Sequence, residues 1–200
     1  ATQVHAGAGR ALSNALARAT EMLALAPPPE RTGAFQDGVN LIEQATRRAA
    51  ATLDSLNVFQ PEPRLKTQIE EWKKAVSTAG ASRREVLGDH YRLLTGQTEL
   101  PTRALSDIEQ RMASKVPELA LGAAEYIEKR FSMRGGGLHG VMVYELPNFV
   151  DGRRSYLDIY RALRAEAQAA GEWYYGTVTA RQVEDALEAA VKAGTLRIKK

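Results

Sequence analysis

The sequence predicts an all-α protein, in which a helical region is followed by a small winged-helix-like C-terminal module. Apolar residues recur three and four positions apart along most of the 200 residues, which is the spacing of one helical face. Alanine is abundant while aromatic residues make up 6%, a composition that favours helices over sheets. Prolines and glycines interrupt the apolar pattern at helix-length intervals and so mark where helices end.

The first half of the chain predicts a series of amphipathic helices. Leu12, Leu16, Ala19 and Leu23 form the apolar stripe of the first, and the triple proline at 27–29 ends it because proline offers no amide donor. The second carries an apolar face from Val39 to Leu56 and ends before Pro61. The pattern weakens beyond residue 97. The expected helices span residues 8–26, 34–58, 64–79, 82–95, a short stretch near 105–114, and 118–132.

Gly80 separates the helices expected over 64–79 and 82–95, because glycine is a natural left-handed helix terminator. Ser82 and Glu85 then have the spacing of a reciprocal capping box at the start of the second of these helices. The inward-facing residues are expected to be Leu65, Ile69, Trp72 and Val76 in the first helix, and Val86, Leu87, Tyr91 and Leu94 in the second.

Three consecutive glycines at 135–137 indicate a hinge, since glycine has no side chain to pack and loses much entropy when ordered. They divide the chain into a helical region over 1–134, a Gly-rich hinge over 135–140 and a winged-helix-like module over 141–200. In this module Ser155 with Asp158, and Thr179 with Gln182, predict two capped helices. The alternation over 195–198 predicts a short edge strand after them.

The composition excludes some classes of protein. Cysteine is absent, so disulfides and cysteine-based zinc sites are ruled out. No apolar run approaches the roughly 20 residues that a spanning helix needs, and we expect no membrane partner. The net charge of +3 is mild for this length. The chain starts at Ala1 rather than at Met, so we expect the numbering to begin inside a longer gene product.

Residues suited to catalysis or metal binding are not arranged for either in this sequence. His5, His90 and His139 lie at no metal-ligand spacing, and we interpret His139 as a partly exposed loop residue. The segment 135–140 lacks the helix start, lysine and hydroxyl of a phosphate cradle. We therefore expect no catalytic, cofactor-binding or metal-binding residue within the chain.

The basic residues of the C-terminal module raise the alternative of a nucleic-acid-binding winged-helix regulator. Its recognition helix would span about 180–193, where Arg181, Gln182, Glu184, Asp185, Glu188 and Lys192 are expected on the solvent face. Three acids among these six residues would repel phosphates, which argues against nucleic acid as a partner. A third reading is a peptide-recognition module that acts through the strand edge at 195–199.

Aromatic residues provide the candidate interaction surfaces. Trp72 lies on the helix expected over 64–79, and Trp173, Tyr174 and Tyr175 follow one another after Gly171. Such a cluster could stack on a base or a sugar, but it is more typical of packing on the protein's own core or on a partner domain.

The stretch Tyr144-Glu145-Leu146-Pro147-Asn148-Phe149-Val150-Asp151-Gly152-Arg153-Arg154-Ser155, with Leu157-Asp158-Ile159, Trp173-Tyr174-Tyr175-Gly176 and the helix ending at Gly194, resembles a known family. It is similar to the C-terminal tail that follows the catalytic domain in some bacterial zinc-dependent aminopeptidases of the transferrin-receptor-like class. A more distant resemblance is to the small winged-helix peptide-binding modules of peptide-modifying systems. The similarity covers about 140–200, whereas 1–134 is similar only in being helical and rich in alanine.

The aminopeptidase resemblance implies two zinc ions in the parent protein, bound by His, Asp and Glu residues, and a secreted or periplasmic location. No stretch of this sequence matches that ligand pattern, so no site residue is carried over. The resemblance therefore implies a non-catalytic accessory region of a metallopeptidase. Its expected role is to pack on the catalytic domain of the parent protein or to mediate homo-oligomerisation.

Overall fold

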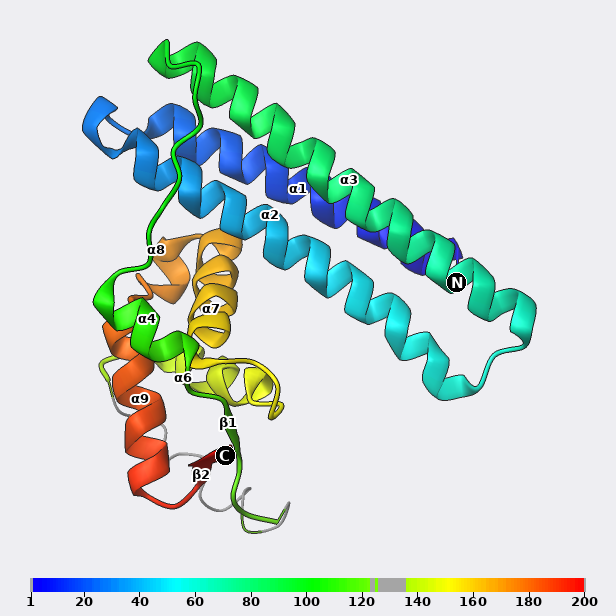
Figure 1. Ribbon diagram of the computed structural model, residues 1–200, viewed down its shortest axis with the longest axis vertical. Coiled ribbons are helices and arrows are strands. Elements are labelled where there is room, and N and C mark those ends of the chain that lie inside the picture. The colour runs from blue at the N-terminus through cyan, green and yellow to red at the C-terminus, as the bar shows by residue number, and fades with distance from the viewer. Residues whose placement is uncertain (1, 123–124, 126–135, 200) are drawn as a thin grey trace. The chain divides into compact units, whose positions relative to one another are not determined.

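The computed structural model describes residues 2–122, 125 and 136–199, and it is mostly helical, as the sequence predicts (Figure 1). In these ranges the sheet is limited to two short strands. The chain forms two compact units, Ala1–Arg103 and Ala104–Lys200. The division predicted at 135–140 instead lies inside the second unit.

The first unit consists of three long helices that lie side by side and contact one another in every pair (Figure 1). They are α1 (Thr2–Leu25), α2 (Arg31–Asp54) and α3 (Pro63–Thr95), with short 3-10 helices at Pro28–Glu30 and Ser55–Phe59. The predicted ends at Pro27 and Gly96 are confirmed, and Gly96 adopts the left-handed conformation with φ of 71°.

The core of the first unit follows the predicted stripes in part. Leu12, Ala19, Leu23, Ile42, Leu53, Ile69, Val76, Leu87 and Tyr91 are buried as expected. Phe35, which the sequence pattern did not place, packs its ring against that of Tyr91 with centroids 4.9 Å apart. The prediction was wrong for Val86, which is 39% exposed, and for Leu65, which is 38% exposed.

Gly80 does not end a helix, and the prediction of two helices over 64–95 was wrong. It is buried in the middle of α3, where an added Cβ would collide with the side chain of Thr46 on α2. Gly38 on α2 has the same role, since its added Cβ would lie 3.0 Å from the Cβ of Ala19 and 2.9 Å from Leu87 Cδ2. Both glycines therefore allow the helices to approach closely.

The second unit is built from short helices around one apolar core. Its described elements are α4 (Asp107–Ala113), β1 (Pro117–Leu119), α6 (Gly140–Glu145), a 3-10 turn (Leu146–Phe149), α7 (Tyr156–Ala170), α8 (Glu172–Tyr175), α9 (Ala180–Lys192) and β2 (Leu196–Ile198). Met112, Met142, Leu146, Ile159, Leu163, Val183 and Leu187 are fully buried within it.

The capping boxes predicted for the second unit are confirmed. Ser155 accepts a hydrogen bond from the Asp158 amide at the start of α7, and Thr179 accepts one from the Gln182 amide at the start of α9. α4 has a further capping box, formed by Ser106 and Glu109, that the sequence analysis did not identify. The short helix expected near 105–114 is confirmed by α4.

The helix expected from residue 118 does not start there, because residues 117–119 form strand β1. This strand pairs antiparallel with β2, with Glu118 opposite Arg197 and 2.7 Å between the carboxylate and the guanidinium. Most of the remainder of that predicted helix lies outside the described residues. The strand predicted over 195–198 is confirmed as β2, with one of its edges occupied by β1.

The described part of the glycine run packs against α9. An added Cβ on Gly136, whose φ is 78°, would collide with the carbonyl oxygen of Gln182. The Gln182 side chain also donates a hydrogen bond of 3.0 Å to the Gly137 carbonyl. These contacts give a physical reason why Gly136 and Gly137 belong to the second unit. Gly135 lies outside the described residues.

Candidate interaction surfaces

The aromatic cluster of residues 173–175 lies on α8, a single helical turn between α7 and α9. Gly171 ends α7 with φ of 100°, and an added Cβ there would lie 2.5 Å from the indole nitrogen of Trp173. The three rings touch edge to face, with centroid distances of 5.5 Å between Trp173 and Tyr174 and 4.9 Å between Tyr174 and Tyr175. The backbone of Gly171 thus makes room for the indole.

These aromatic residues differ in what they contact. Tyr175 is half-buried and packs against the core of the second unit, whereas Trp173 is 87% exposed and Tyr174 is 53% exposed. Trp173 and Tyr174 therefore contribute little to the apolar core of the second unit. An exposed tryptophan beside an exposed tyrosine, on a short helix that packs on the core through Tyr175, is typical of a protein contact site.

Trp72 belongs to the first unit, on α3, and is half-buried. It lies in a row of α3 residues that includes Leu65 and Val86, both of which the sequence analysis had assigned to the core. Leu93 is 84% exposed and continues the row, although no sequence argument had identified it. Trp72 thus belongs to the first unit and the α8 cluster to the second.

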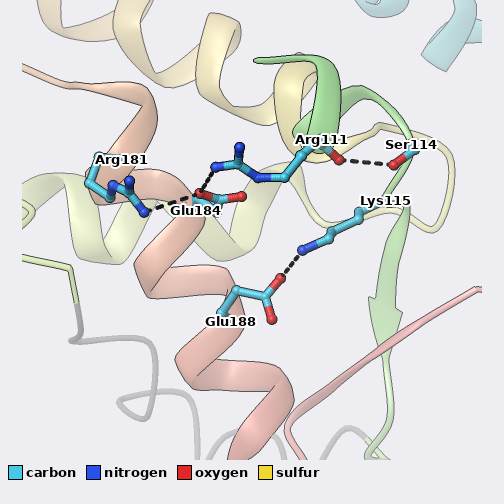
Figure 2. Close-up of polar contacts among 6 residues, drawn as sticks. All are labelled: Arg111, Ser114, Lys115, Arg181, Glu184 and Glu188. Carbon is cyan, nitrogen blue, oxygen red and sulfur yellow. Dashed lines mark hydrogen bonds and ion pairs between the residues drawn. The ribbon is translucent and has the colours of Figure 1, made fainter. Parts of the chain in front are cut away.

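Of the three acidic residues of α9 predicted to face solvent, Asp185 does so and Glu188 is partly exposed, but Glu184 is buried, which weakens the electrostatic argument against nucleic-acid binding. Glu184 is 5% exposed and contacts Arg111 at 3.4 Å and Arg181 at 3.7 Å (Figure 2). Glu188 pairs with Lys115 at 2.6 Å. Arg111 comes from α4, so these contacts link α4 to α9.

Ser114 closes the end of α4 within the same cluster, where its hydroxyl donates 2.9 Å to the Arg111 carbonyl (Figure 2). The exposed positions of α9 include Arg181, Asp185 and Lys192, which have mixed charge. This helix therefore presents neither a concentrated acidic nor a concentrated basic face to a nucleic acid.

Several basic residues of the second unit bind its own groups. Arg164 donates 2.9 Å to the Val178 carbonyl, and the Lys199 ammonium donates 3.3 Å to the Gly152 carbonyl. The Arg154 guanidinium lies 5.3 Å from the centre of the Phe149 ring and 3.7 Å from Asp151. These contacts give the basic residues a structural role in fixing the turn before α7 and the link before α9.

The Asp151-Gly152-Arg153-Arg154 turn has a defined geometry. The Asp151 carboxylate accepts hydrogen bonds of 2.9 Å from the amides of Arg153 and Arg154, and Gly152 has φ of 70°. Burial raises the pKa of Asp151, but backbone hydrogen bonds, chiefly from the Arg154 and Arg153 amides, together with the charge of Arg154 outweigh burial and hold that pKa below its usual value. The ionised carboxylate thereby stabilises the turn by accepting from both amides.

The histidines are not brought into a metal site in the described part of the chain. His139 is exposed beside Gly176, and His90 is exposed on α3. Among the described residues, no group of three His, Asp or Glu side chains is placed to hold a metal ion. The side chain of His5 lies outside the described residues.

The helices of the described ranges include none that is both long and apolar enough to cross a membrane. Comparison of the chain with known proteins adds no relative, because no protein family, curated protein or solved structure matches it.

Proposed function

We propose that this chain is a non-catalytic interaction region of a larger zinc metallopeptidase, and that its second unit is a winged-helix-like module that docks on a partner domain. The order of the described elements, α4, β1, α6, α7, α8, α9 and β2, supports the winged-helix-like description through its last part. In it two capped helices are followed by a strand that pairs back onto an earlier one.

The metallopeptidase part of the proposal rests on the resemblance of residues 144–155 to the tails of such enzymes. The structure supports a defined role for these residues. The Asp151 turn leads directly into the Ser155 cap, and the aromatic segment at the other end of α7 forms α8. The Asp151 turn and the aromatic segment therefore lie at the two ends of the same helix, within the second unit.

The observation that carries the docking role is the 87% exposure of Trp173 on α8. This helix follows the buried Gly171 and packs against the core of the unit through Tyr175. Exposing an indole to water is unfavourable, and tryptophan is enriched among the residues that dominate binding energy. We therefore expect Trp173 and Tyr174 to be covered when the region meets its partner domain.

The reading frame upstream of Ala1 provides the first test. We expect it to encode a two-zinc ligand pattern of His, Asp and Glu residues, and the isolated 200-residue chain to bind no stoichiometric zinc and to show no aminopeptidase activity. A start codon immediately upstream, or stoichiometric zinc in the isolated chain, would contradict the proposal.

The second test measures the affinity of the chain for the separately produced peptidase domain by calorimetry. Trp173→Ala should weaken binding by about 30-fold, the effect expected of a hot-spot residue worth about 2 kcal/mol. Val58→Ala is the matched control, because Val58 is 79% exposed and lies on the first unit. Equal affinities for Trp173→Ala and the unaltered chain would remove Trp173 from the interface.

A further inference from the structure

The two compact units are joined by a segment that has no regular structure. Their division falls between Arg103 and Ala104. Residues 101–106 belong to no helix, strand or turn (Figure 1), and residues 102–104 are all exposed. Proteolytic cleavage of folded proteins concentrates in exposed loops and in the linkers between domains. This segment is therefore accessible to a protease while both units are folded.

Two leucines anchor the segment on either side of the exposed residues. Leu100 packs on α3, where an added Cβ on Gly88 would lie 3.0 Å from Leu100 Cδ1. Leu105 packs against the core of the second unit, and its carbonyl oxygen accepts a hydrogen bond of 3.1 Å from Gln110. Residues 102–104 belong to neither core, so a cut among them removes no buried side chain. Since the chain contains no cysteine, no disulfide would join the two products.

Arg103 has the side chain that a trypsin-like serine protease selects. Such an enzyme binds the residue before the scissile bond in an acidic pocket, which favours arginine through charge-assisted hydrogen bonds. It also binds the substrate backbone as an extended strand, which a helix or a tight turn supplies only after opening. Ala104, which follows the bond, is small and places no bulk beside the reacting carbonyl. The segment thus suits both the pocket and the backbone site.

The other basic residues of the described ranges are less suited to such an enzyme. Most of them lie on helices. Arg197 belongs to β2, which is paired with β1. The Lys115 carbonyl accepts a hydrogen bond of 2.9 Å from the Tyr156 amide. The Lys199 amide likewise donates 2.9 Å to the Val116 carbonyl. Each of these backbones would have to leave its own structure before a protease could bind it.

Arg153 and Arg154 provide the closest comparison, because they too lie outside the helices and strands. Their amides both donate 2.9 Å to the Asp151 carboxylate, and Gly152 has φ of 70°. A protease can bind this stretch as an extended strand only after both hydrogen bonds are broken. The bonds that follow these two arginines are therefore an internal control with the same recognised side chain.

We propose that the peptide bond between Arg103 and Ala104 is the cleavage site of a trypsin-like serine protease, which divides the chain into two folded products. Hydrolysis adds one water molecule across this bond. The Arg103 carbonyl carbon gains the hydroxyl and becomes a carboxylate, and the Ala104 nitrogen gains the proton and leaves as an amine. The site goes beyond the docking role proposed above and uses no residue of α8.

Limited digestion of the full chain with trypsin, followed by intact-mass spectrometry, tests the site. The readout is the release of the fragment 1–103, because its mass does not depend on cuts elsewhere beyond residue 103. Cleavage after Arg103 should be at least about 10-fold faster than cleavage after Arg153, since the turn must open before it is cut. Equal rates, or earlier cleavage after Arg153, would overturn the proposal.

Substitutions test whether backbone structure selects the site. Asp151→Ala removes the acceptor of both amides and should speed cleavage after Arg153 by about 10-fold, with no change after Arg103. Arg103→Gln should abolish the fragment 1–103, whereas the matched control Arg153→Gln should leave its release unchanged. A rate after Arg153 that did not rise in Asp151→Ala would overturn the selection of Arg103 by backbone structure.

The products should remain folded, and the natural protein should contain them. After complete cleavage, the digest should keep the helical circular dichroism of the intact chain. Intact-mass spectrometry of the protein isolated from its source, with no protease added, should detect a product that begins at Ala104. Loss of helical signal on cleavage, or a source protein without this product, would overturn the inference. Trp173→Ala should leave cleavage after Arg103 unchanged, so this site can fail while docking through α8 stands.

Discussion

Gly80 determines how closely α2 and α3 approach, because the side chain of Thr46 occupies the space that a Cβ would need. Alanine is a better helix former than glycine by about 1 kcal/mol, so in an open helix the exchange would stabilise. At this crossing the steric cost is expected to exceed that gain, since overpacking of a close contact costs about 1–3 kcal/mol.

We therefore predict that Gly80→Ala lowers the free energy of unfolding by about 1 kcal/mol or more, measured by urea denaturation followed by circular dichroism. Gly33→Ala, on an exposed part of α2 with nothing near an added Cβ, is the control and should be neutral or stabilising. Adding Thr46→Ala to Gly80→Ala should restore part of the loss. Equal stability of the two glycine variants would contradict the proposed close approach.

Tyr156 is the second residue whose environment gives a testable consequence. Its side chain is fully buried, and within the described chain its hydroxyl has no hydrogen-bond partner. Burial, reinforced by the charges of Glu188 and Glu184, raises the pKa of Tyr156 well above its ordinary value of 10.0. The folded state thus keeps the proton at a pH where the unfolded chain loses it.

The sign of the pH effect follows from this difference. Below about pH 10 the Tyr156 hydroxyl is neutral in both states, so its titration does not affect the free energy of unfolding. Above about pH 10 that free energy should fall by up to about 1.4 kcal/mol per pH unit, because the hydroxyl ionises only in the unfolded chain. Tyr156→Phe should be nearly neutral at pH 7 and should remove this decline, measured as the difference in urea midpoint between pH 8 and pH 11. The same decline in both proteins would contradict the burial argument.

At the scale of elements, two predicted capping boxes were correct, whereas the box expected at Ser82 and Glu85 was wrong because both residues lie inside α3. The boxes Ser155–Asp158 and Thr179–Gln182 span four residues each, so their sequence pattern alone defines the helix starts. Gly80 has the sequence pattern of a terminator, and only its contact with Thr46, 34 positions away in the sequence, distinguishes it from one. The pairing of β1 with β2 is likewise set by residues far apart in the chain.

The candidate surfaces show the same division. The aromatic cluster was visible in the sequence, but its exposure depends on how α8 packs on Gly171 and on the core. The sequence pattern places Val86 and Leu65 in the core because residues of two apolar rows on one helix both lie three or four positions apart. Spacing alone therefore does not distinguish the two rows. Only the burial of each residue separates the core row from the row that contains Leu65, Trp72 and Val86.

We predict that loss of the α7 cap weakens the second unit. Ser155→Ala removes the hydroxyl that accepts from the Asp158 amide and donates 2.8 Å to its carboxylate, and it should cost about 1 kcal/mol. Ser155→Thr preserves the hydroxyl and should restore most of that free energy. The measurement is the thermal midpoint by circular dichroism, and identical midpoints for the alanine and threonine variants would contradict a capping role.

At the scale of the whole molecule, the two units each bury a core of their own, and each has about the size at which a domain folds independently. Coupling between substitutions is small when the residues share no partners. The core of the first unit includes Ile42 and Leu87, which lie before the division at residue 103. The core of the second unit includes Met112 and Leu163, which lie after it. Local unfolding should therefore be confined to the unit in which a substitution is made.

Amide hydrogen exchange of the full chain, resolved by peptide mass spectrometry, tests this independence. Gly80→Ala should speed exchange in α1, α2 and α3 while leaving α7 and α9 unchanged, and Ser155→Ala should have the opposite pattern. The physical reason is that each substitution lowers the opening free energy of only the core that it touches. Faster exchange in both units after either substitution would show that the cores unfold together, and it would contradict the assignment of two folding units.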